Sequence, residues 1–78
     1  MFKKVVSFVI RKRDVIAVID SIASYGIVTI AIAPSKGVES YAVMIECDKN
    51  NLQNCLSKLM ELSERRVTIR KLDVTTKI

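Results

Sequence analysis

The chain has 78 residues, which is the length of a single domain, so we expect one domain over residues 1–78. Half of the residues are hydrophobic, which excludes a disordered chain. Histidine is absent, which excludes histidine-based catalysis and histidine metal ligation. The 13 lysines and arginines against 8 aspartates and glutamates give a formal net charge of +5, which permits anionic partners without requiring them. We expect no metal and no cofactor.

The first apolar run spans residues 5–10 and is shorter than a signal-peptide core or a membrane span. We therefore expect a cytoplasmic protein with no membrane contact. The alternation over residues 3–10 predicts a strand with Val6, Phe8 and Ile10 on one face. Asp14 is a good N-cap for a helix that continues to about Tyr25 and is followed by a glycine.

Residues 27–33 form a second apolar run, and because both of its faces are apolar we expect a strand that is covered on both sides. Residues 34–37 predict a turn, and residues 39–47 predict a third strand. In that third strand one face is apolar and carries the residues Tyr41, Val43, Ile45 and Cys47.

The apolar stripe over residues 51–63 predicts a second helix, with a capping box formed by Asn50 and Gln53. Residues 66–76 predict a last strand. The apolar alternation changes phase at Arg70 and Lys71, which indicates a bulge.

The predicted order of elements is β-α-β-β-α-β. It favours an α+β sandwich of ferredoxin-like topology. We expect a four-stranded antiparallel sheet in the order 4-1-3-2, with both helices on one face.

This topology brings basic residues together at one end of the sheet, where two predicted strands end and two begin. They form a basic rim of Arg11, Lys12, Arg13, Lys36, Arg65 and Arg66. Such a rim can hold phosphate or carboxylate groups by charge-assisted hydrogen bonds. The alternative is a solvated rim that keeps the protein soluble.

The sheet face without helices carries more apolar side chains than a monomer needs. We expect an oligomer interface there, formed by Val5, Val9, Val28, Ile30, Ile32 and Met44. Exposed apolar patches of this kind usually mark association surfaces, and a homo-oligomer would bury this one. The alternative is a monomer with an apolar sheet face.

Two cysteines, Cys47 and Cys55, are too few for a disulfide framework. We expect two buried, reduced thiols. A redox pair is the alternative.

The segment Gly26-Ile27-Val28-Thr29-Ile30 follows the first predicted helix directly, and with the overall order of elements it resembles an ACT-type regulatory domain. The resemblance spans nearly the whole chain and implies binding of an amino acid or another small effector at a dimer interface. It places the ligand near the loop after the first strand, where the family often has a glycine and this chain has Asp14. The implied ligand-binding residues are Arg11, Arg13, Asp14 and Thr29.

Three functions compete. A non-enzymatic regulatory and oligomerisation module, which relays a signal to a partner protein, fits the topology and the apolar face. A nucleic-acid-binding protein would use the basic rim for phosphate contacts, since Phe8 and Tyr41 are assigned to the helix-covered face, where they pack rather than stack on bases. An enzyme is not expected, because no nucleophile lies beside a base.

Overall fold

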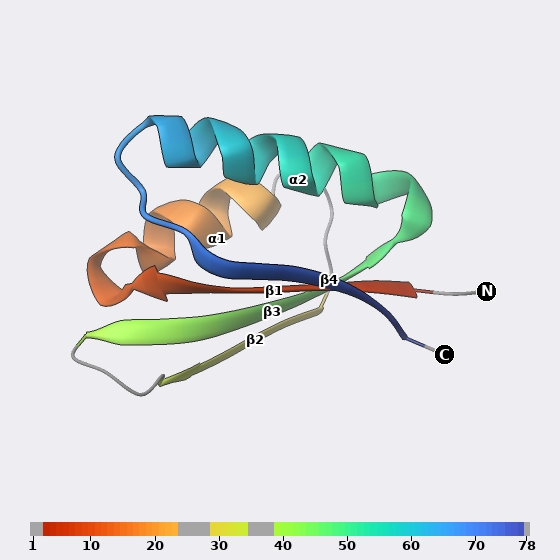
Figure 1. The fold of residues 1–78 in the computed structure, drawn as a ribbon, viewed down its shortest axis with the longest axis horizontal. Coiled ribbons are helices and arrows are strands. Elements are labelled where there is room, and N and C mark those ends of the chain that lie inside the picture. Colours follow the sequence, from red (N-terminus) through yellow and green to blue (C-terminus); the bar gives the residue numbers. More distant parts are fainter. Residues whose placement is uncertain (1–2, 24–28, 35–38, 78) are drawn as a thin grey trace.

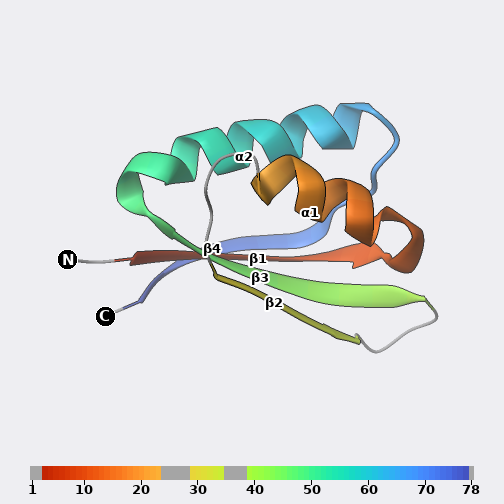
Figure 2. The same ribbon diagram turned by 180° about the vertical axis from the view of Figure 1, so that it is seen from behind.

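The computed structural model describes residues 3–23, 29–34 and 39–77. They form β1 (Lys3–Arg11), a short 3-10 turn (Lys12–Asp14), α1 (Val15–Ala23), β2 (Thr29–Pro34), β3 (Ser40–Asp48), α2 (Lys49–Glu64) and β4 (Arg70–Lys77). Both helices lie on the same side of the sheet (Figure 1), and the view from behind shows the same two layers (Figure 2).

The sheet order is β2-β3-β1-β4, and each neighbouring pair is antiparallel. The predicted order 4-1-3-2 with both helices on one face is therefore confirmed. Residues paired across antiparallel strands share a face of the sheet, so the register assigns every strand position to the helix-covered face or to the open face.

The core lies between the sheet and the two helices. Val6, Phe8 and Ile10 of β1 are fully buried there, as their alternation predicts. The remaining core side chains come from β3, from both helices and from the segment after α2: Val18, Ile22, Val43, Ile45, Cys47, Cys55, Leu59, Leu62 and Val67. Burial of apolar side chains is the main force that holds the two layers together.

The start of α2 differs from the prediction. The helix begins at Lys49 with Asp48 as its N-cap residue, so Asn50 lies inside the helix and the predicted capping box is wrong. The Asp48 side chain makes no capping hydrogen bond. Residues 48–51 are all polar, so the sequence pattern did not identify which of them begins the helix. The predicted end of α1 near Tyr25 and the following glycine lie outside the described residues.

The second strand also differs from the prediction. β2 runs from Thr29 to Pro34, so Pro34 belongs to the strand rather than to the turn. A proline is tolerated there because β2 is an edge strand. Residues 31–34 are exposed in the single chain, so the expected covering of both faces is not found within it.

The last strand begins at Arg70, later than predicted, and the predicted bulge is confirmed. The register of β4 against β1 shifts between Ser7 and Val9. Lys71 has a φ of 53°, in the left-handed region that a non-glycine residue rarely adopts.

The end of α2 is a Schellman motif, the hydrogen-bonding pattern in which a left-handed residue terminates a helix. The amide of Val67 donates to the carbonyl of Leu62 at 3.2 Å, and Arg66 between them has a φ of 79°. Val67 and Leu62 are both buried. Glycine is the usual residue at the left-handed position, and the arginine there carries a steric cost.

We expect Arg66→Gly to stabilise the fold by about 1 kcal/mol, since glycine removes the cost of a left-handed non-glycine residue. Urea unfolding followed by circular dichroism measures the change. Arg66→Ala is the matched control, because alanine removes the same charge and keeps the steric cost. Equal stabilities of the two variants would contradict the assignment of the motif.

Candidate anion site at one end of the sheet

A pocket of about 420 Å³ lies at the end of the sheet where β1 ends and β3 and β4 begin. We call it the anion pocket. Its lining residues are Arg11, Lys12, Arg13, Glu39, Ser40, Thr68 and Arg70. Four cationic side chains therefore surround one carboxylate, which gives the pocket a positive charge.

Strand pairing brings two sides of the anion pocket together. Arg11 at the end of β1 pairs with Ser40 at the start of β3. The 3-10 turn that follows is held beside the start of β3, because the amide of Lys12 donates to the carbonyl of Glu39, the residue before that strand, at 2.7 Å. The backbone thus fixes the positions from which the Arg11, Lys12 and Arg13 side chains extend.

The third side depends on the bulge in β4. Asp73 pairs with Ser7, so an uninterrupted antiparallel register would place Arg70 opposite Ile10, a fully buried core residue. The bulge instead pairs Arg70 with Val9, and one step of register moves a side chain to the other face of the sheet. Arg70 therefore belongs to the open face and to the anion pocket.

Arg70 is held across the sheet by a hydrogen bond. Its Nη2 donates to Oγ of the buried Ser40 at 3.0 Å, which links β4 to β3 past the intervening β1. A hydrogen bond from a charged donor is stronger than a neutral one, so it orients the guanidinium group. The remaining donors of the guanidinium stay available for a ligand.

Backbone strain accumulates around the anion pocket. Glu39 in its lining has a φ of 57°, and Lys71 is adjacent to Arg70 in the sequence. Non-glycine residues in the left-handed region each cost about 1 kcal/mol or more, and such residues cluster at ligand sites.

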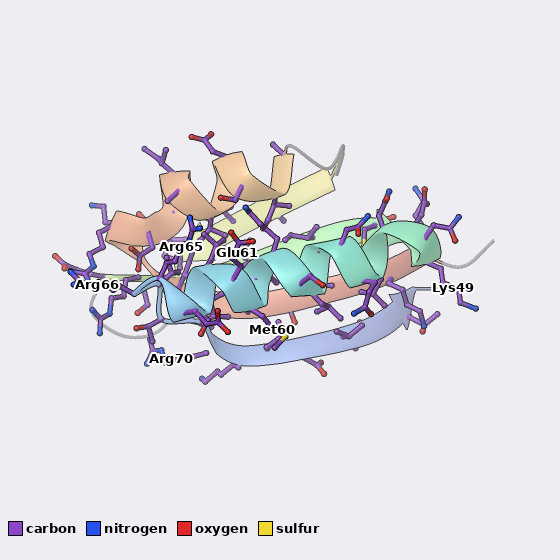
Figure 3. The ribbon with its side chains drawn as sticks, turned by 90° about the horizontal axis from the view of Figure 1, so that it is seen from above. Lys49, Met60, Glu61, Arg65, Arg66 and Arg70 are labelled. Carbon is purple, nitrogen blue, oxygen red and sulfur yellow. The ribbon has the colours of Figure 1, made fainter. Side chains whose placement is uncertain are left out.

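The structure brings together part of the predicted basic rim. Arg11, Lys12 and Arg13 line the anion pocket. Arg65 and Arg66 lie at the same end of the molecule as Arg70 (Figure 3) but are not lining residues. Lys36 lies outside the described residues.

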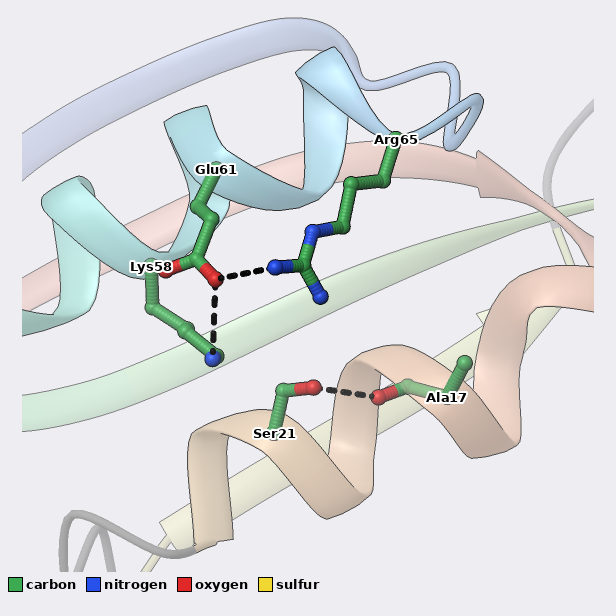
Figure 4. A network of polar contacts seen from close by, with 5 residues as sticks. All are labelled: Ala17, Ser21, Lys58, Glu61 and Arg65. Carbon is green, nitrogen blue, oxygen red and sulfur yellow. Dashed lines mark hydrogen bonds and ion pairs between the residues drawn. The ribbon is translucent and has the colours of Figure 1, made fainter.

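Arg65 is engaged on α2 instead. Its Nη2 lies 3.4 Å from Oε1 of Glu61, and Nζ of Lys58 lies 3.6 Å from the same oxygen (Figure 4). On the neighbouring α1, Oγ of Ser21 donates to the carbonyl of Ala17 at 2.9 Å. Arg65 is largely exposed, so the ion pair contributes little to stability.

The ligand-binding residues that the ACT resemblance implies do not all lie close together within one chain. Asp14 directly follows the basic turn, and its Oδ1 lies 3.9 Å from Nε of Arg13. Its Oδ2 is buried and has no hydrogen-bond partner among the described residues. Thr29 pairs with Glu46, which pairs with Val5, so its position lies about 20 Å along the sheet from Arg11 by strand geometry.

Sequence analysis missed three residues of the anion pocket: Ser40, Thr68 and Arg70. The change of phase at Arg70 was a usable signal for one of them, since a bulge re-aims a side chain. Ser40 and Thr68 are single hydroxyl residues without a motif, and only the fold places them beside the arginines.

The open face differs from the prediction in β2. Ile32 pairs with the buried Val43, so it lies on the helix-covered face, and its position on the open face was wrong. The position of Ile30 lies opposite the buried Ile45, two residues before Ile32 on the same strand. The predicted placement of Ile30 on the open face is therefore corrected in the same way. Continuous apolar runs carry no alternation, so the sequence could not set the phase of this strand. Val28 lies outside the described residues.

The open face that the structure shows is a shallow surface of small and medium side chains. Val5 and Val9 are half-buried on it, and Met44 is 51% exposed. A groove of about 320 Å³ crosses it between β1, β3 and β2, and Val9, Ala31, Ala33, Ala42 and Met44 are among its lining residues.

The two cysteines are free and buried, as predicted. Burial raises the pKa of the Cys55 thiol to about 11, and the nearby Cys47 adds to this shift. Burial also raises the pKa of Cys47, with a further contribution from the Asp48 carboxylate. A raised pKa keeps a thiol protonated and weakly nucleophilic, so the redox-pair alternative gains no support.

Metal ligation and membrane insertion gain no support from the described residues. Among them no group of three or more cysteine, aspartate and glutamate side chains could hold a metal ion. None of the helices in this part of the chain has the length and apolar character needed to cross a membrane.

The described residues form a ferredoxin-like βαββαβ unit with a charged pocket at one end of its sheet. No protein-family model and no curated protein sequence matches the chain. Solved structures do match. A protein assigned to the PII-like signalling class from Thermus thermophilus matches with a TM-score of 0.81 and 11% identity over 100% of this chain and 91% of that one.

Two further solved structures also match the chain. CPII, a nitrogen regulatory PII-like protein from Thiomonas intermedia K12 bound to ADP, AMP and bicarbonate, has a TM-score of 0.76 and 9% identity over 100% of this chain and 94% of that one. The regulatory subunit of aspartate kinase from Thermus thermophilus has a TM-score of 0.65 and 15% identity over 95% of this chain and 50% of that one.

At these identities the comparisons establish the fold alone. The chain shares it with PII-like signalling proteins and with a regulatory subunit of an amino-acid kinase. The sequence analysis named the ACT type and not the PII-like proteins, which have the higher TM-scores. A shared fold does not determine a function, which has to be argued from the site.

We expect the free energy of unfolding to fall as the pH rises from 9 towards 11. The unfolded Cys55 thiol loses its proton near its usual pKa of 9.0, whereas the folded thiol keeps it to about 11, so high pH favours the unfolded chain. Urea unfolding across this pH range tests the slope. Cys55→Ala is expected to flatten it, and parallel curves for the two proteins would contradict the assignment.

Proposed function

We propose that this chain is a non-enzymatic regulatory module that binds a small anionic effector in the anion pocket. The observation that carries the proposal is the convergence of Arg11, Arg13 and Arg70 with the Ser40 hydroxyl at one end of the sheet. The proposal assigns no catalytic role to any residue.

The chemistry of the lining residues favours an oxyanion. Guanidinium groups bind carboxylate and phosphate through paired hydrogen bonds, and Ser40 and Thr68 add hydroxyl donors. The Glu39 carboxylate on the same wall can accept a hydrogen bond from an ammonium or hydroxyl group of the effector. A free amino acid or a phosphate-bearing molecule has this combination of groups. The structural similarity to CPII, which was solved with ADP, AMP and bicarbonate, supports the same chemical class.

We also propose that the module works as a homo-oligomer that associates through the open face. Val5, Val9 and Met44 contribute apolar surface there, and the adjacent alanines leave the sheet accessible to close approach.

Nucleic-acid binding through the basic end is the alternative function. It would rest on phosphate contacts, because Phe8 is fully buried and Tyr41 pairs with the buried Ile10 on the helix-covered face. No described aromatic side chain therefore lies on the open face to stack on bases.

Effector binding is tested by isothermal titration with inorganic phosphate, bicarbonate, ADP and aspartate. We expect at least one of them to bind. We also expect Arg70→Ser to weaken that binding by about tenfold or more, because a charge-assisted hydrogen bond contributes about 1.5–3 kcal/mol. Arg65→Ser is the matched control, since Arg65 lies at the same end of the molecule outside the pocket.

Two results would overturn the effector proposal. One is equal weakening by both arginine variants, which indicates a general effect of charge. The other is binding of a single-stranded oligonucleotide that falls steeply with salt while none of the four small anions binds, which identifies the nucleic-acid alternative.

Oligomerisation is tested by sedimentation of Met44→Lys. A lysine at the centre of an apolar interface has to be buried without a partner, so we expect a shift to the monomer. Ile16→Lys is the matched control, because Ile16 is 75% exposed on α1 and off the open face. A wild-type monomer at high micromolar concentration, or an assembly unchanged in Met44→Lys, would contradict the interface.

A further inference from the structure

The anion pocket and the groove on the open face adjoin one another on the side of the sheet away from the helices (Figure 1). We call the second hollow the apolar groove. Arg11 and Ser40, a cross-strand pair, line the anion pocket. Val9 and Ala42, the next pair on the same face, line the apolar groove. Residues two apart along a strand share a face and lie about 7 Å apart, so the apolar groove begins where the anion pocket ends.

Arg70 lies at the junction of the two hollows. It pairs with Val9 from the β4 side of β1, while its Nη2 donates to Oγ of Ser40 on the far side of β1. Its side chain therefore crosses the open face of β1 between the anion pocket and the apolar groove. A guanidinium group has five N–H donors, so those not bonded to Ser40 can meet an anionic group at this junction.

The apolar groove is a recess rather than a ridge. Its centre carries the alanines of two paired strands, Ala31, Ala33 and Ala42, whose short side chains leave the sheet hollow between Val9 and Met44. Its polar lining residues are Ser7 and Lys71. A lysine can lay its aliphatic stem along an apolar surface while its ammonium group stays in water, so Lys71 is compatible with an apolar ligand.

The far end of the apolar groove is polar and paired in charge. Two residues beyond Met44, Oε1 of Glu46 lies 3.6 Å from Nζ of Lys3, and neither residue lines the apolar groove. Asp73 pairs with Ser7 from the β4 side and is not a lining residue either. The apolar groove therefore leads from the cationic pocket to a polar end, with no carboxylate in its lining.

We propose that the effector of the anion pocket is an amphiphile with an oxyanion head and an unbranched apolar tail. The head binds Arg70 and Arg11, and the tail lies in the apolar groove over the alanines. This inference rests on the proposed function, because the head occupies the anion pocket. The distance along β3 from Ala42 to Glu46 is about 14 Å, which limits the tail to a chain of medium length.

The shape of this face favours one dissolved amphiphile over a membrane surface. Recessed alanines accept a chain but do not project into a bilayer. Proteins that lie on a membrane insert large apolar side chains, aromatic ones among them. No described aromatic residue lies on the open face, since Phe8 and Tyr41 belong to the helix-covered face.

The test is calorimetric titration with methyl, butyl and octyl phosphate, which share one head group, and with acetate and octanoate as the carboxylate pair. A fully buried methylene tightens binding by about fourfold, and in an open groove we expect about half of that free energy, or about twofold. Octyl phosphate or octanoate is therefore expected to bind about tenfold or more tightly than its short homologue. Octyltrimethylammonium has the same tail and the opposite charge, and we expect no binding.

Ala42→Phe is the first variant, because a phenyl ring at the centre of the apolar groove occupies the place of the tail. We expect it to remove the advantage of the octyl chain and to leave methyl phosphate unchanged. Ala33→Phe is a second variant on the other side of the groove. Ala17→Phe is the matched control, since Ala17 is exposed on α1. Circular dichroism shows that each variant is folded, and all titrations use a protein concentration at which sedimentation shows a single state.

The proposal is overturned if both long-chain ligands bind no more tightly than their short homologues, or if Ala42→Phe and Ala17→Phe have equal effects. It is also overturned if octyltrimethylammonium binds as tightly as octyl phosphate, or if Arg70→Ser leaves octyl phosphate binding unchanged. Cosedimentation with phosphatidylglycerol vesicles in the absence of octyl phosphate binding would assign the face to a membrane.

The outcomes separate this inference from the proposed function. If the short anions bind through Arg70 and the tail adds nothing, the inference fails and the anion pocket stands. If neither these ligands nor the four small anions bind, both fail.

Discussion

The left-handed backbone at Lys71 decides how the last strand meets the rest of the sheet. After it, Val74 lies opposite the buried Val6 and belongs to the helix-covered side. Before it, Arg70 lies opposite Val9 and belongs to the open face. Without this one inserted residue the guanidinium would be directed into the core, where a charge without a partner is very costly. One unfavourable dihedral angle thus lets the same strand place Val74 toward the apolar core and Arg70 in the cationic pocket.

The anion pocket is a property of the tertiary structure rather than of a motif. Arg11 comes from the end of β1, Ser40 from the start of β3 and Arg70 from the start of β4. The hydrogen bond between Arg70 and Ser40 closes the arrangement across the central strand. The charges converge although their segments are far apart in the sequence. Like charges brought together in this way repel one another, and a bound anion relieves the repulsion.

Sequence patterns predicted the parts of the fold in which side chains alternate. The alternation of Val6, Phe8 and Ile10 indicates their burial, and the leucines of α2 indicate the face that packs on the sheet. The patterns failed at β2, where a continuous apolar run leaves the phase open, and Ile32 was assigned to the wrong face. The pocket was predicted in part: the consecutive basic residues after β1 are visible in the sequence, whereas Ser40 depends on strand register, which no local pattern encodes. For Arg70 the change of phase indicated a bulge but not its place in the pocket.

The position of β1 at the centre of the sheet has a consequence for how the chain acquires its structure. β1 is the first strand in the sequence, and its neighbours β3 and β4 are the third and the last. Lys3 pairs with Lys77, so almost the whole chain separates these two partners. Contacts between such distant segments slow folding, because the loop entropy is lost before the contacts form. During synthesis β1 therefore remains without one of its neighbours until β4 has been made. The apolar residues of β1 depend until then on β3 and the helices for protection from aggregation.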